Sequence, residues 1–276
     1  MNTAYTANTA GTIAGLGNEA VTLSDTTLAA SVLNTLNGNT TGVVNAGTVA
    51  TLTGAAADAN TAYAANAAGT ISNLGNEAVT LTDTSIDALV LHTLDAYTSG
   101  VVDASTVTSV SGLAPTVITI YASGGISGLG DEAVTLSSNT SVSNANSVSS
   151  TTSGIVTATI SEGDMATLAN ITETGNAYTV TITDTSVASD ALNTLDGKTT
   201  VAVNGAAITT LTGAASDVKA TYDANTAGTI SGLGNEAVSV SGASSAASDL
   251  NAIDTATSGV VTVASTTITG TAADVK

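Results

Sequence analysis

Apolar and polar residues follow two alternating patterns along this chain. Short segments such as Val21-Thr22-Leu23 alternate apolar with polar residues, which is typical of a strand with one buried face. Apolar residues at helical spacing follow, as in Leu28, Val32, Leu33 and Leu36. The pattern therefore predicts strands that alternate with helices.

These predicted strands recur at regular intervals. Their starts lie about 28 residues apart, with one double gap, and a Leu-rich helix alternates with an Ala-rich one. The starts are Val21, Val49, Val79, Val107, Val134, Val180, Ile208, Val238 and Ile268. With a further coil in the gap, the spacing predicts about ten strand–helix coils.

One motif marks every second coil. Gly15–Leu23 returns at 74–81, 128–136 and 232–240, with a degenerate copy at 175–182. Such periods are typical of solenoids, in which each coil buries its apolar side only against the next coil. We expect an α/β fold, a parallel strand–helix solenoid similar to leucine-rich repeats, over 1–276 as one continuous array. An all-β solenoid is the alternative.

The middle of the chain departs from the pattern, with irregular coils expected at about 112–176. The Ser-rich stretch 137–150 has little helix propensity and is expected to be a loop, whereas 161–168 is expected to hold a short helix.

Polar positions in the repeat give local expectations. The aspartates before the Leu-rich helices should cap the helices that follow them, and Asn37-Gly38 should end the first of these helices. Strand Thr and Ser residues should face solvent. The aspartates are Asp25, Asp83 and Asp184, and the outward residues are Thr22, Thr80, Thr82, Thr135, Thr181, Thr183 and Ser239.

Charge narrows the range of partners. The formal net charge is -19, with only three lysines. Nucleic acid and anionic membranes are poor partners because both need a cationic face. The sequence has no run of about 18 apolar residues, so no membrane insertion is expected. Absence of cysteine permits an extracellular location.

Candidate catalytic groups are few. His92 is the sole histidine, and the matching positions of the other Leu-rich helices hold Asn34, Asn193 and Asn251. A surface substitution explains it better than a catalytic base, because a nucleophile, a base and an orienting group cannot readily be assembled from this composition. We therefore expect that the protein is not an enzyme.

Acidic residues at the Gly-Leu-Gly turn are candidate calcium ligands. They recur every second coil and should line one edge, and calcium prefers six to eight oxygens. A diffuse acidic edge is the competing interpretation. The residues are Glu19, Glu77, Asp131, Glu132 and Glu236.

Four tyrosines share one repeat position on the Ala-rich helix. They are expected to form a core ladder between coils, with a sugar-stacking platform as the alternative. The four are Tyr5, Tyr63, Tyr121 and Tyr222.

Both ends of the sequence match parts of one internal helix. Residues 2–13 repeat as 60–71, and 270–276 resemble 213–219. We therefore expect either a slice of a longer array or copies that join head to tail. The expected assembly ends carry Asn2, Tyr5, Ala273 and Val275.

The repeat frame formed by Gly15–Leu23, Leu192–Gly197 and Thr51–Ala56 resembles repeats of giant exported surface proteins of bacteria, notably marine cyanobacteria. The resemblance implies a secreted or cell-surface adhesin, matrix filament or surface-layer component. We expect a structural extracellular protein that forms a rod, filament or surface layer by head-to-tail stacking. The alternative is an adhesin or binding module that recognises glycan or another surface through its exposed Thr face.

Overall fold

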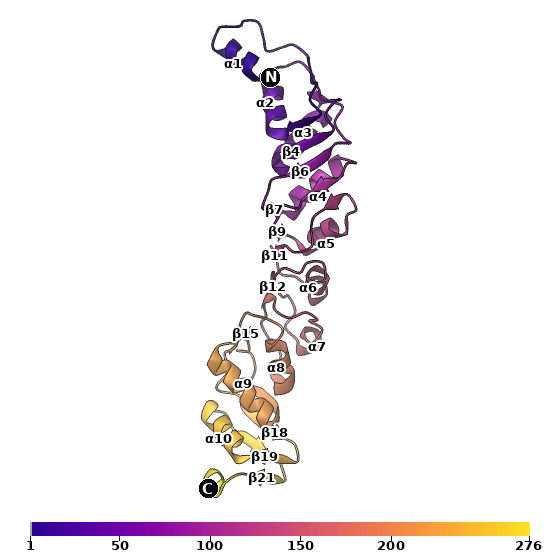
Figure 1. The fold of residues 1–276 in the computed structure, drawn as a ribbon. Coiled ribbons are helices and arrows are strands. Elements are labelled where there is room, and N and C mark those ends of the chain that lie inside the picture. The colour runs from indigo at the N-terminus through magenta and orange to yellow at the C-terminus, as the bar shows by residue number, and fades with distance from the viewer. Residues whose placement is uncertain (1) are drawn as a thin grey trace. The chain divides into compact units, whose positions relative to one another are not determined.

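A computed structural model describes residues 2–276 and shows an α/β fold in which parallel strands alternate with helices (Figure 1). The described chain divides into two compact units. The first comprises the residues up to Thr135 together with Thr151–Gly154, and the second comprises Leu136–Ser150 and Ile155–Lys276. The single continuous array expected from the sequence stays a prediction.

The described part of the first unit contains five helices and eleven strands, the last of which ends at Leu136, the first residue of the second unit. The helices are α1 (Asn2–Thr9), α2 (Ala30–Asn39), α3 (Ala56–Ala67), α4 (Ala88–Tyr97) and α5 (Ala114–Ala122). The strands are β1 (Val21–Thr22), β2 (Thr27–Ala29), β3 (Val44–Asn45), β4 (Thr51–Gly54), β5 (Ile71–Ser72), β6 (Ala78–Leu81), β7 (Ser85–Asp87), β8 (Val102–Asp103), β9 (Ser109–Gly112), β10 (Ile126–Ser127) and β11 (Ala133–Leu136).

The second unit repeats the same order of elements. Its helices are α6 (Val142–Ser149), α7 (Met165–Leu168), α8 (Ser189–Asp196), α9 (Ala215–Ala227), α10 (Ala247–Ala256) and α11 (Ala272–Val275). Its strands are β12 (Val156–Thr159), β13 (Ala177–Thr179), β14 (Ser186–Ala188), β15 (Val203–Asn204), β16 (Thr210–Ala214), β17 (Ile230–Ser231), β18 (Ala237–Ser241), β19 (Ser244–Ala246), β20 (Val261–Val263) and β21 (Thr267–Thr269).

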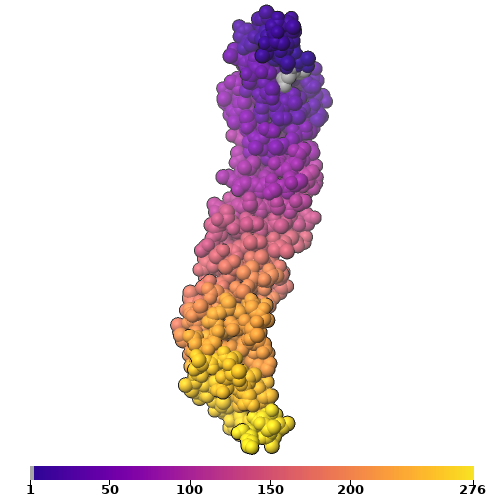
Figure 2. Space-filling view, turned by 90° about the vertical axis from the view of Figure 1, so that its left-hand side faces the viewer, coloured from indigo at the N-terminus to yellow at the C-terminus, as the bar shows by residue number. Residues whose placement is uncertain are grey.

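Strands pair in parallel with strands of the neighbouring strand–helix segments. In the first unit the orders are β1-β3-β5, β2-β4-β6-β8-β10 and β7-β9-β11. In the second they are β12-β13, β14-β16-β18-β20, β15-β17 and β19-β21. Within each unit, segments that are neighbours in the sequence are therefore also neighbours on the surface, as the gradual change of colour shows (Figure 2). The all-β alternative is wrong, because a helix lies between the two members of each hydrogen-bonded strand pair in these orders.

The strand register repeats with connections of slightly different length. Leu28 pairs with Leu52, and Leu52 pairs with Val79, so the second connection is a little longer than the first. In the second unit Thr157 pairs with Ala177, and this connection is shorter than either of those two. The shortened connection lies inside the region expected to be irregular.

Strand residues alternate between core and solvent as predicted. Val79 and Leu81 of β6 are buried, whereas Thr80 between them is exposed. The other predicted outward residues are also exposed, namely Thr22, Thr82, Thr135, Thr181, Thr183 and Ser239. Helix side chains such as Leu33 and Leu36 cover the apolar side of the strands. None of the helices among residues 2–276 combines the length and apolar character that crossing a bilayer requires.

The Ser-rich stretch is a helix, so the predicted loop is wrong. Ser141 caps α6 by accepting a hydrogen bond from the backbone N–H of Asn144 at 3.2 Å. Val142, Ala145 and Val148 recur at helical spacing and are buried. Packing of this face overrides the low helix propensity of serine. The short helix predicted at 161–168 is confirmed as α7.

The predicted aspartate caps act on a different helix. Helices α2, α4 and α8 begin later than expected, because Leu28, Ile86 and Val187 lie in strands. Asp83 instead accepts a hydrogen bond from the backbone N–H of Ala56, the first residue of α3, at 2.8 Å. Asp184 does the same for Met165 of α7 at 2.7 Å. Each carboxylate therefore caps the helix of the preceding segment.

Two further local expectations have different outcomes. Gly38 lies inside α2 and does not end it, whereas the left-handed stop occurs at Gly228 after α9, with φ 84°. His92 is exposed, as a surface substitution should be. The Asn residues at its repeat position tie successive helices together: Asn34 Nδ2 donates to the Asp58 carbonyl at 2.9 Å, and Asn193 Nδ2 donates to that of Asp217 at 2.9 Å.

Candidate functional site

The Gly-x-Glu turn before β6 is built around a buried carboxylate. Gly75 has φ 140°, a conformation that favours glycine, and its N–H donates to Glu77 Oε2 at 2.8 Å. The Tyr63 hydroxyl of α3 donates to the same oxygen at 3.0 Å. Glu77 is 1% exposed. Burial of a carboxylate is costly, so these two donors are needed to stabilise it.

The next strand–helix segment closes over this turn. The Thr98 hydroxyl donates to the Glu77 carbonyl at 2.7 Å, and the Gly100 N–H donates to Thr98 Oγ1 at 3.0 Å. A Cβ at Gly100 would lie 2.2 Å from the Glu77 carbonyl oxygen. Glycine is therefore required here because the two backbones touch. We call this arrangement of Tyr, Glu, Thr and Gly the Tyr–Glu–Thr contact.

The Tyr–Glu–Thr contact occurs at every intact copy of the motif. In each, the Tyr hydroxyl donates to the Glu carboxylate, and the Thr hydroxyl donates to the Glu carbonyl at 2.6 to 2.7 Å. The other copies are Tyr5–Glu19–Thr40–Gly42 and Tyr121–Glu132–Thr152–Gly154 in the first unit, and Tyr222–Glu236–Thr257–Gly259 in the second.

The degenerate copy differs at both the Glu and the Gly position of the contact. Tyr178 stands at the Glu position, since its carbonyl accepts from the Thr199 hydroxyl at 2.7 Å. Val201 stands at the Gly position, since its N–H donates to Thr199 Oγ1 at 3.1 Å. Tyr178 is completely buried. The buried carboxylate and the glycine that approaches it are thus lost as a pair.

At these contacts the pKa of each tyrosine is raised, and at the first contact the pKa of the glutamate is lowered. The hydrogen bond from Tyr5 and the Gly17 N–H lower the pKa of Glu19 to about 2. Burial is the first cause that raises the pKa of Tyr222, to about 12, and Glu236 adds to it. Burial likewise raises the pKa of Tyr63, Tyr121 and Tyr178. For Tyr5 the hydrogen bond to Glu19 is the first cause of a raised pKa.

The four tyrosines that were expected to form a core ladder are the tyrosines of the four Tyr–Glu–Thr contacts. Tyr5, Tyr63 and Tyr222 are buried and Tyr121 is half-buried, so their rings present no platform for stacking a sugar. Tyr63 stacks on Tyr97, with ring centroids 5.7 Å apart.

The predicted acidic edge is wrong for three of its glutamates, because Glu77, Glu132 and Glu236 are buried. Glu19 is half-buried and Asp131 is exposed. Among residues 2–276, no three Asp, Glu, His or Cys side chains gather closely enough to hold a metal ion. Calcium at these residues stays a prediction, and each of the four glutamates already accepts hydrogen bonds from the protein.

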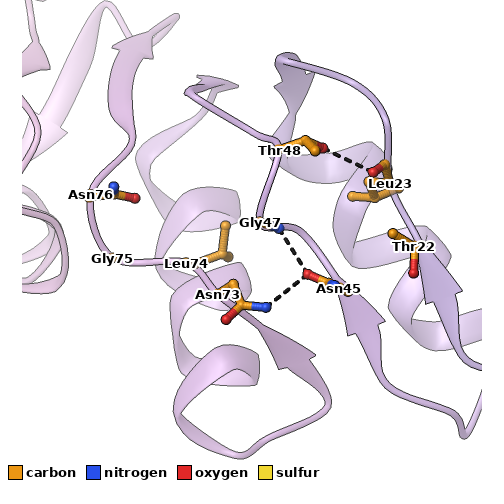
Figure 3. Close-up of a pocket in the computed structure, with 9 residues that line it drawn as sticks. All are labelled: Thr22, Leu23, Asn45, Gly47, Thr48, Asn73, Leu74, Gly75 and Asn76. Carbon is orange, nitrogen blue, oxygen red and sulfur yellow. Dashed lines mark hydrogen bonds between the residues drawn. The ribbon is translucent and has the colours of Figure 1, made fainter.

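An open groove of about 660 Å³ lies on the first unit. Figure 3 shows that Asn45 and Asn73 meet at its floor: Asn73 Nδ2 donates to Asn45 Oδ1 at 2.8 Å, and the Gly47 N–H donates to the same oxygen at 3.1 Å. Its lining comprises Thr22, Leu23, Asn45, Gly47, Thr48, Asn73, Leu74, Gly75 and Asn76. Amide and hydroxyl groups of this kind can exchange hydrogen bonds with a polar ligand.

The remaining predicted residues lie in terminal elements of the described chain. Helix α1 begins at Asn2 and carries Tyr5, whose contact with Glu19 is described above. Helix α11 carries Ala273 and Val275; Ala273 is exposed, and Val275 is more than half exposed.

Comparison with protein-family models, with curated proteins and with solved structures found no match in any of the three.

Replacement of Gly100 by alanine should destabilise the first unit by ~1–3 kcal/mol, because the added methyl group meets the Glu77 backbone, which cannot move away without separating two segments. The measurement is the urea midpoint followed by far-UV circular dichroism.

Gly38→Ala is the matched control. A Cβ there meets nothing within 4 Å and Gly38 is helical, so this variant should gain about 0.5–1 kcal/mol. Equal midpoints for the two variants would contradict the close approach at Gly100.

Tyrosine ionisation should require a higher pH in the native protein than in the unfolded protein. Because the native pKa of Tyr222 is raised from 10.0 to about 12, its contribution to stability is fully present below pH 10 and is lost as the pH rises through about 12. Absorbance at 295 nm near pH 11 should therefore show less tyrosinate in native protein than in guanidinium chloride. Superimposed titration curves would show that these hydroxyls are not held as described.

Proposed function

We propose that this chain is a structural, extracellular repeat protein, a continuous parallel strand–helix solenoid of about ten coils that builds a rod, filament or surface layer by head-to-tail stacking. The Tyr–Glu–Thr contact carries this proposal. It joins successive segments through the same buried groups in both units, and a repeated identical joint supports a protein whose purpose is extension.

The position of the titratable groups supports a structural role over an enzymatic one. An active site needs a nucleophile, an acid or a base that can meet a substrate. Here the recurring glutamates and tyrosines bind one another below the surface, and His92 lies exposed on a helix. The glutamates and tyrosines therefore stabilise the fold.

Composition supports the extracellular assignment. The sequence has no cysteine and carries a formal net charge of -19, which is compatible with an oxidising exterior and with cations as counterparts. Its resemblance to repeats of exported bacterial surface proteins supports the same location.

Electron microscopy of the purified full-length protein tests this proposal. We expect elongated particles, filaments or sheets in which successive segments stack along one direction. A field that contains only dispersed compact particles would contradict the structural role.

Recognition of a glycan is the second candidate function, and the groove on the first unit favours it. Thr22, Thr48 and Asn73 present hydroxyl and amide groups there, and sugar hydroxyls bind such groups. The exposed Thr80 and Thr82 extend the polar surface of the strands.

A glycan array tests this second candidate. Binding should occur with the intact protein and fall at least tenfold on Asn76→Ala, which removes an amide from the groove. Asn18→Ala, at the same position of the first copy of the motif, is the matched control outside the groove lining. Absence of any bound glycan would exclude this function for the array tested.

A further inference from the structure

We propose that the first unit has a receiving face, formed by Val21, Leu23, Asp25, Leu28 and Val32, that binds residues 267–275 of a second copy of this chain. The proposal rests on the structural function above and names the residues through which copies join. Three features of the receiving face each match a contact that the chain already makes internally at the next copy of the Gly-Leu-Gly motif.

The first feature is a sheet edge. Strand β4 pairs with β6, with Thr51 opposite Ala78 and Gly54 opposite Leu81. Strand β1 is the counterpart of β6 in the preceding repeat. Among the described residues β1 pairs with β3 alone. Strand β21 occupies the β4 position and, within residues 2–276, pairs with β19 alone. A second copy's β21 can therefore pair with β1, with Thr267 opposite Ala20 and Gly270 opposite Leu23.

The second feature is a capping carboxylate. Asp83 and Asp184 each bind the first backbone N–H of a preceding helix. Asp25 holds the same repeat position, and within residues 2–276 its carboxylate accepts no hydrogen bond. In the proposed register the residue that reaches Asp25 is Ala272, the first residue of α11 and the counterpart of Ala56.

The third feature is matched apolar surface. Leu23, Asp25, Leu28, Val32 and Leu36 line a cavity of about 130 Å³, and Val32 is 40% exposed. Val275 of α11 is 56% exposed, although Val218 at the same position of α9 is fully buried.

The exposed valine fits the cavity chemically. Docking of α11 over the cavity would bury Val275 against Leu28 and Val32. Internally, α3 packs on α4 in the same way, and Asn60 Nδ2 donates to the carbonyl of Val90, the counterpart of Val32, at 3.0 Å. A face of the first unit and a segment of the second unit of another copy make a heterologous contact, which can repeat from copy to copy.

Two single variants and their mixture test the contact. Val32→Asp damages the receiving face and Val275→Asp damages the docking segment, and both residues are exposed enough for the fold to tolerate the change. Sedimentation velocity of the intact protein should show a mean mass that rises with concentration. Each variant alone should lose association by about tenfold or more, because every copy then lacks one half of the joint.

The mixture separates this contact from general adhesion. Val275→Asp copies keep an intact receiving face and Val32→Asp copies keep an intact docking segment, so an equimolar mixture should form dimers and nothing larger. Leu89→Asp is the control, because Leu89 is 61% exposed on α4 outside the joint, and this variant should associate like the intact protein. Circular dichroism of every variant confirms that the fold is kept.

Several outcomes would overturn the proposal. They are an intact protein that stays monomeric at every concentration, variants that associate like the intact protein, and a mixture that stays monomeric. The structural function is judged separately: elongated monomers in electron micrographs, or filaments unaffected by either variant, would overturn this joint and leave that function standing.

Discussion

Burial of a carboxylate where one strand–helix segment meets the next is the constraint on which this structure depends. Strands of two to five residues and helices of four to thirteen are too short to be stable alone. At Glu77 the carboxyl group accepts hydrogen bonds from Tyr63 and Gly75, and the following segment donates to the backbone carbonyl of the same residue. An incomplete contact would leave buried polar groups without donors, so the groups order the neighbouring segments together.

The sequence predicted the elements that depend on periodicity and missed those that depend on neighbours. Alternation at Val79-Thr80-Leu81 correctly indicated a strand with one exposed face. Asp83 was assigned to the wrong helix because the N–H group that it binds belongs to the preceding segment, which the local sequence does not reveal. Glu77 looked exposed because charge alone suggests solvent, and only the recurring tyrosine in the preceding helix could have indicated a buried pair. The α6 helix was missed since its packing face outweighs serine propensity.

The degenerate copy clarifies which residues change together. Where Tyr178 replaces glutamate, Val201 replaces the glycine that would otherwise touch its backbone, yet Thr199 keeps both of its hydrogen bonds. The threonine therefore joins segments independently of the carboxylate. Glutamate and glycine, in contrast, occur together at the intact copies and are both absent from this one.

The short connections between paired strands bear on how the chain reaches its native state. Each strand pairs with one that follows a single strand–helix segment later, as at Thr157–Ala177 and Leu52–Val79. The entropy of closing each loop is therefore small and nearly constant along the chain. Folding can begin at any well-packed pair of segments and spread outward through nearest neighbours, so its rate is set by local closures and changes little with the total number of segments.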